Sequence, residues 1–136
     1  MNITFDKITL QFIVLIHTLF VLFVTITPFT SSNYFLLLHA IVVPFVMLHW
    51  LLNNNMCSLT LFEKALREKI TGVKTTKKEC FTCKIIEPIY DFKNNYKERS
   101  AIIYAGTSIL LFITIYKLYK KYKDGKIKSI YDLLKL

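Results

Sequence analysis

Charged side chains are missing from residues 8–62, a run of 55 positions in a chain of which 20% is charged. Lys7 precedes this run and Glu63 follows it. A soluble domain is excluded, because its surface requires charge and its core is never one continuous segment of this length. The sequence therefore predicts an all-α integral membrane protein with a single membrane domain, residues 1–136.

Recognisable catalytic patterns are also missing. The chain has only three glycines, and it shows no Gly-rich phosphate loop, no paired catalytic carboxylates and no Ser–His–Asp set. The net charge is +9, but no nucleic-acid-reading motif accompanies it. We interpret positive charge beside membrane spans as a signal for topology and for lipid headgroups, and we expect no nucleic acid as a partner.

Three segments are long and apolar enough to cross a bilayer: residues 8–27, 34–52 and 100–119. Twenty helical residues span ~30 Å, the thickness of the hydrocarbon core. Residues 28–33 have turn composition, so the first two spans should form an antiparallel hairpin. Pro44 lies inside the second span, where we expect a kink that neighbouring groups make tolerable.

Residues 53–99 form a polar loop that begins with three asparagines, which favour the end of a helix. Thr60 and Glu63 have the spacing of a capping box, so we expect Thr60 to open a helix and Gly72 to end it. The apolar residues of this helix fall on one stripe: Leu61, Phe62, Ala65, Leu66 and Ile70. This stripe predicts an amphipathic helix on the membrane surface, and its packing on the protein's own spans is the alternative.

The third span has small residues at positions 101, 105 and 108, where a neighbouring helix can approach closely. The basic tail, residues 120–136, follows this span, and its apolar residues are placed to dip into the interface. The basic residues near the span ends are equally numerous on the two faces of the membrane. We expect the tail to be cytosolic, because its lysines are closely spaced and lie next to the membrane.

Cys80 and Cys83 form a Cys-X-X-Cys pair flanked by lysines, which favour the reactive thiolate. Such a pair suits a membrane thiol oxidoreductase, with Cys57 as a possible third thiol. No thioredoxin-like βαβ pattern surrounds the pair. A structural disulfide in an oxidising compartment and two unpaired loop cysteines are the other interpretations, and the last is the simplest.

Two further sets of residues have metal or cofactor chemistry. One would make a Cys₃His zinc site on one membrane face: His49, Cys57, Cys80 and Cys83. The other consists of His17 and His39, which lie at membrane depth and would suit haem ligation, a proton relay or quinone contact. A neutral imidazole that only joins helices by hydrogen bonds is the competing interpretation. We expect no cofactor.

The segment Cys57 to Glu63, which follows a span with a histidine, resembles a family of uncharacterised small bacterial membrane proteins with the motif Cys-Pro-Leu-Thr-Pro-Leu-Glu. Four residues match the motif: Cys57, Leu59, Thr60 and Glu63. Its two prolines are replaced by Ser58 and Leu61. The longer string from His49 to Glu63 is similar to uncharacterised membrane proteins of giant DNA viruses. This resemblance implies a multi-helix membrane fold and no assigned activity.

Together these patterns predict a non-enzymatic structural or interaction component of a membrane, which would be a host or virion membrane if the protein is viral. The expected partners are the lipid bilayer with its anionic headgroups and either a second copy of the chain or another membrane protein. The alternatives are the thiol oxidoreductase and a histidine-ligated cofactor protein.

Thiol labelling of a Cys57→Ser chain tests the cysteine interpretations. We expect Cys80 and Cys83 to react with a maleimide reagent without prior reduction, as unpaired loop cysteines do. Labelling that requires a reductant would instead show an oxidised pair, as the disulfide and the oxidoreductase both predict. The Cys80→Ser and Cys83→Ser variants then separate the structural disulfide from the oxidoreductase, because these substitutions abolish function only if the protein is the enzyme.

Overall fold

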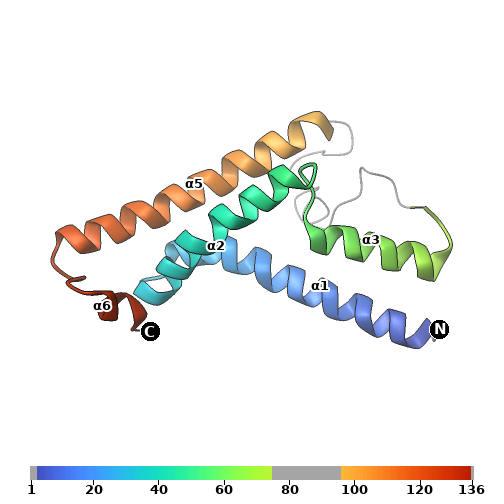
Figure 1. Ribbon diagram of the computed structural model, residues 1–136, viewed down its shortest axis with the longest axis horizontal. Coiled ribbons are helices and arrows are strands. Elements are labelled where there is room, and N and C mark those ends of the chain that lie inside the picture. The colour runs from blue at the N-terminus through green and yellow to red at the C-terminus, as the bar shows by residue number, and fades with distance from the viewer. Residues whose placement is uncertain (1–2, 75–95, 136) are drawn as a thin grey trace. The chain divides into compact units, whose positions relative to one another are not determined.

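The computed structural model of the protein describes residues 3–74 and 96–135, and over these residues the chain is helical without strands (Figure 1). The elements are α1 (Ile3–Ile26), the short 3₁₀ helix η1 (Thr27–Phe29), α2 (Asn33–Leu52), α3 (Ser58–Thr71), α5 (Tyr96–Lys123) and α6 (Ile130–Leu134). The all-α prediction is confirmed.

Three helical segments of the described chain are long and apolar enough to cross a membrane: Ile3–Phe29, Asn33–Leu52 and Ser100–Lys123. This confirms the prediction of three helices that could span a membrane; the first begins before residue 8 and the third continues beyond residue 119. The first extends because Asp6 is buried and ion-paired. The third extends through lysines in its last turn, where cations interact favourably with the helix dipole.

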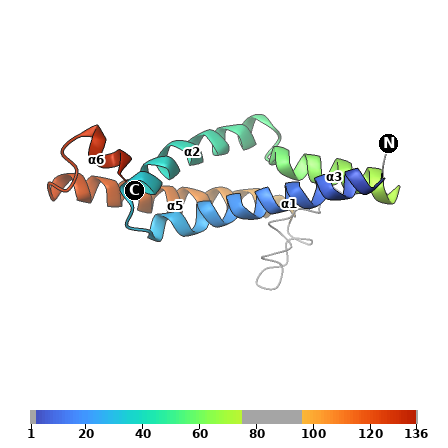
Figure 2. The ribbon, with the colours of Figure 1, turned by 90° about the horizontal axis from the view of Figure 1, so that it is seen from below.

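The chain divides into two compact units. Unit 1 contains residues 1–21 and 50–101, which include the first part of α1, the end of α2, α3 and the start of α5. Unit 2 contains residues 22–49 and 102–136, which include the end of α1, η1, most of α2, most of α5, and α6. Within unit 1, α3 runs beside the first part of α1 in the opposite direction (Figures 1 and 2).

Burial in the described chain differs from that in a soluble domain. Polar residues outnumber apolar ones among the buried residues of the described chain, and the polar ones are Asp6, His17, Thr27, His39, Thr60, Glu63, Thr107 and Thr114. Large apolar side chains lie on the outside instead, among them Phe12, Phe45 and Phe112. Hydrocarbon solvates such a surface and offers polar groups no hydrogen bonds, so this pattern suits a bilayer.

The predicted capping box at Thr60 is wrong. Helix α3 begins at Ser58, with Cys57 as its N-cap residue and no side-chain hydrogen bond at that cap. Thr60 and Glu63 are buried, and the Glu63 carboxylate bonds Arg67 rather than returning to the Thr60 backbone. An earlier helix start and a local ion pair within α3 thus replace the predicted capping box.

Both predicted helix ends are confirmed. Helix α2 ends at Leu52, and Asn54 and Asn55 follow with left-handed φ angles of 52° and 60°. The Asn55 N–H donates to the Trp50 carbonyl over 2.7 Å. Helix α3 ends at Gly72, whose φ of 71° suits glycine, and the Gly72 N–H donates to Glu68 over 2.8 Å. Pro44 lies inside α2, and the kink there stays a prediction.

A capping box that the sequence analysis missed opens α6. The Ser129 hydroxyl accepts from the Tyr131 N–H over 3.0 Å. The Asp132 carboxylate accepts from the N–H groups of Ser129 (3.1 Å) and Lys128 (3.0 Å). The buried side chain of Ile127 anchors the chain just before this cap. The segment after α5 is therefore a fixed structure.

The Asp132 cap makes α6 sensitive to acid. Hydrogen bonds from the backbone N–H groups of Lys128 and Ser129 lower the pKa of Asp132 below its ordinary value of 3.8. Because the pKa of Asp132 is lower in the folded than in the unfolded chain, the ionised carboxylate stabilises α6 at pH values above the unfolded-state pKa. This stabilisation is lost as the pH falls through the folded-state pKa. We expect the Ser129 amide chemical shift to follow a titration whose midpoint lies below pH 3.8. A transition at higher pH, or one that persists in Asp132→Asn, would contradict this assignment.

Candidate functional site

Each unit contains one cluster of buried polar side chains around a histidine. The His39 cluster, in unit 2, consists of His39, Thr114 and the carbonyl groups of Val24 and Leu110. The His17 cluster, in unit 1, consists of His17, Glu63 and Arg67. These two clusters are the candidate sites that the described residues offer.

The His39 side chain connects three helices. Its ring is fully buried, with 0% exposure. The Nε2 atom lies 3.0 Å from the Val24 carbonyl oxygen of α1, and Nδ1 lies 3.0 Å from the Thr114 hydroxyl of α5. The ring of Phe23 contacts His39 with a centroid separation of 5.9 Å. One residue of α2 thus holds both neighbouring spans.

The hydrogen-bond partners determine where the protons of this cluster lie. A carbonyl oxygen only accepts, so Nε2 of His39 must donate to Val24. In the neutral ring Nδ1 is an acceptor, and the Thr114 hydroxyl donates to it. That hydroxyl also lies 3.2 Å from the Leu110 carbonyl, but it has only one proton to donate. A doubly protonated ring would donate to Thr114, whose hydroxyl would then turn to Leu110.

This arrangement argues for helix association rather than ligation at His39. Both ring nitrogens already have protein partners, so a metal or haem iron would have to displace one of them. Hydrogen bonds between membrane helices contribute about 0.6 kcal/mol each on average and up to about 1.7 kcal/mol. The His39 cluster is thus suited to fixing the positions of three helices.

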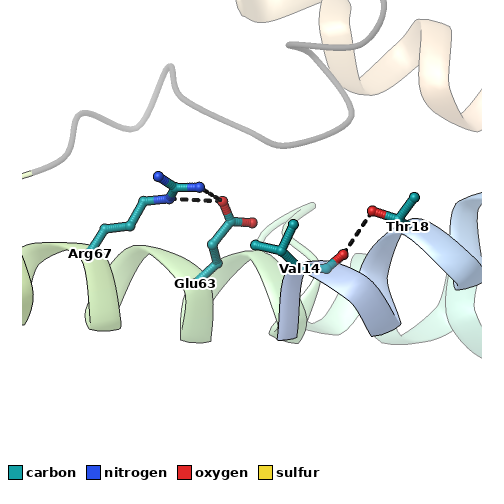
Figure 3. Close-up of polar contacts among 4 residues, drawn as sticks. All are labelled: Val14, Thr18, Glu63 and Arg67. Atoms are coloured by element: carbon teal, nitrogen blue, oxygen red, sulfur yellow. Dashed lines mark hydrogen bonds and ion pairs between the residues drawn. The ribbon is translucent and has the colours of Figure 1, made fainter. Parts of the chain in front are cut away.

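The His17 cluster pairs buried groups of α1 and α3. Glu63 is buried, and its Oε1 atom accepts from Arg67 at 2.8 Å (Nη2) and 2.9 Å (Nε). His17 is buried as well and interacts electrostatically with the Glu63 carboxylate. Figure 3 shows the Arg67–Glu63 pair on α3 and, on α1, the Thr18 hydroxyl donating to the Val14 carbonyl over 2.8 Å.

A second ion pair, between Lys69 of α3 and Asp6 of α1, joins the two helices directly. The Lys69 ammonium lies 3.0 and 2.9 Å from the two carboxylate oxygens of Asp6, which is buried near the start of α1. In both pairs the acid is buried and the base is partly exposed, because the long basic side chains reach outward. Removing either base would leave a buried carboxylate uncompensated, which is strongly destabilising.

The other predicted site residues belong to the zinc and dithiol hypotheses. Cys57 has a free thiol at the N-cap of α3, and His49 is exposed in α2. Cys80 and Cys83 lie outside the described residues. Within residues 3–74 and 96–135, no group of three or more His, Cys, Asp or Glu residues is placed to hold a metal ion. The zinc and dithiol hypotheses therefore remain predictions.

Sequence reasoning missed four members of these networks: Asp6, Arg67, Lys69 and Thr114. Arg67 lies four residues after Glu63, a helical ion-pair spacing that is readable in the sequence. Asp6 was recognisable as an acid one turn before an apolar run. Thr114 gave no signal, because its partner lies 75 residues earlier.

The described chain is helical, and three of its helices are long and apolar enough to cross a membrane. Some of its buried polar residues form the His39 and His17 clusters. A family model described as "Protein of Unknown function (DUF2784)" matches residues 7–117. The chain belongs to this family. Searches of curated proteins and of solved structures give no match.

Replacing Thr114 by valine tests the His39 cluster. Thr114→Val keeps the side-chain shape but removes the hydroxyl, leaving Nδ1 of His39 without this partner. We expect unfolding in mixed micelles to become easier by about 1 kcal/mol. Thr9→Val is the matched control, because the Thr9 hydroxyl donates to the Phe5 carbonyl of its own helix. Equal effects of the two substitutions would disprove an interhelical role.

Proposed function

We propose that the protein is a non-enzymatic structural or interaction component of a membrane. It acts through the faces that its helices present to lipid and to other membrane helices. The observation that supports this proposal is the burial pattern of the described chain. The polar groups of His39, Glu63 and Asp6 are bonded to protein groups, whereas large apolar side chains cover the outside.

Helix α5 supplies the face that we propose for a protein partner. Ala101, Ala105 and Ser108 share one face of this helix, and all three are exposed. The neighbouring Gly106 has open space around it as well. Small residues let two membrane helices approach closely enough to gain packing energy that lipid chains do not provide. A second copy of the chain or another membrane protein would occupy this face.

Helix α3 supplies a face for lipid. Phe62 is 62% exposed and Leu61 39% exposed, while Thr60 and Glu63 on the same helix are buried. Leu61 and Phe62 are thus turned away from the protein, while Leu66 and Ile70 are half-buried. The exposed pair supports a position of this helix at the membrane interface.

We place the basic tail in the cytosol, because cytoplasmic leaflets contain the anionic lipids that lysines attract. The similarity of the segment from His49 to Glu63 to membrane proteins of giant DNA viruses favours a viral membrane as the setting.

Self-association measured by energy transfer between labelled copies in liposomes tests the α5 face. We expect Ala105→Leu to weaken association at least about fivefold, since the added bulk separates the two helices. Ala65→Leu is the matched control, because it adds the same bulk to an exposed alanine of α3. It should leave self-association unchanged. A wild-type chain that stays monomeric and cross-links to no membrane protein in its native membrane would overturn the proposal.

A further inference from the structure

The last turns of α5 contain two pairs of lysines with different surroundings. The inner lysine pair, Lys117 and Lys121, faces the turn between η1 and α2. The Lys117 ammonium donates to the Thr30 carbonyl over 3.3 Å. The Lys121 ammonium donates to the Ser31 carbonyl and, over 2.6 Å, to the Asn33 side chain. The inner pair therefore has a structural task, which is to hold the turn.

The outer lysine pair, Lys120 and Lys123, is exposed on the same turns of α5. Three exposed tyrosines lie beside it: Tyr116, Tyr119 and Tyr122. Tyrosine is enriched where a membrane span meets the headgroup layer, and this segment lies at the end of a candidate span. The outer pair is thus positioned at the level of lipid phosphates.

Helix α6 is held beside this segment within unit 2. The Asn33 side chain donates to the Asp132 carbonyl over 3.1 Å and so ties α6 to the start of α2. Despite this tether, α6 turns apolar side chains outward: Ile130 is 73% exposed and Tyr131 79% exposed. A helix held in place with its apolar residues outward is suited to an apolar medium, not to water.

The exposed charge on this surface has one dominant sign. Lys120, Lys123, Lys126 and Lys128 are exposed, with Asp124 as the exposed acid among them, while Asp132 is bonded to backbone N–H groups. A free phosphate would satisfy the lysines but not the apolar residues of α6. A phospholipid satisfies both, because its phosphate is attached to acyl chains.

We propose that the outer lysine pair, Lys126, Lys128 and the exposed residues of α6 form a binding surface for the headgroups of anionic phospholipids. This deepens the proposed function and rests on it, since the surface requires that α5 crosses a bilayer. The lysines bind the phosphate groups, and Ile130 and Tyr131 enter the interface below them.

Lipid retention by the full-length chain tests this surface. The protein is reconstituted in equimolar phosphatidylglycerol and phosphatidylcholine, and the lipids that stay bound after release into detergent are counted by native mass spectrometry. We expect at least about fivefold enrichment of phosphatidylglycerol, since one interfacial lysine contributes on that order. Replacing Lys120, Lys123, Lys126 and Lys128 by glutamine should bring the ratio close to one.

The inner lysine pair provides the matched control. Lys117→Gln with Lys121→Gln removes half as many charges from the same segment; it should lower thermal stability and preserve the enrichment. Millimolar inorganic phosphate should not displace the bound lipid. Equal retention of the two lipids by the wild-type chain, or their displacement by phosphate, would overturn the headgroup site. That failure is distinct from failure of the proposed function, which energy transfer between copies reports independently.

Discussion

The hydrocarbon of a bilayer offers no hydrogen-bond partner, and the structure depends on this constraint. Every polar side chain placed at that depth must be satisfied inside the protein. His39 meets the requirement by bonding a carbonyl of α1 and a hydroxyl of α5. The same requirement turns the acids of unit 1 inward. Polar side chains therefore predominate among the buried residues because the surrounding hydrocarbon is apolar.

The two ion pairs of unit 1 show how charge is tolerated beside a span. Asp6 and Glu63 are short acids that are buried between α1 and α3. Lys69 and Arg67 are long bases that neutralise them while remaining partly exposed. Because the polar face of α3 is used in this way, Leu61 and Phe62 are left on its exposed side. In a soluble protein the apolar face of the same helix would be buried and its polar face would be exposed to water.

The sequence predicted features that depend on neighbours in the chain. The spans followed from the uncharged run, and the helix ends at Asn54 and Gly72 followed from local backbone preferences. The spacing Thr60-X-X-Glu63 failed, whereas the equivalent Ser129-X-X-Asp132 forms a capping box. In α3 the Glu63 carboxylate instead pairs with Arg67, four residues later on the same helix, whereas the Asp132 carboxylate of α6 accepts from backbone N–H groups at its own cap. The partner of His39 could not be predicted, because no local pattern records a contact over 75 residues.

The distance between His39 and Thr114 along the chain also has a consequence for biogenesis. During synthesis the first two helices enter the bilayer before α5 exists. At that stage Nε2 of His39 already has the Val24 carbonyl, but Nδ1 still lacks the hydroxyl that arrives 75 residues later. The early hairpin therefore exposes one unsatisfied nitrogen to hydrocarbon. Arrival of α5 removes this defect, so the third helix completes the insertion of the first two.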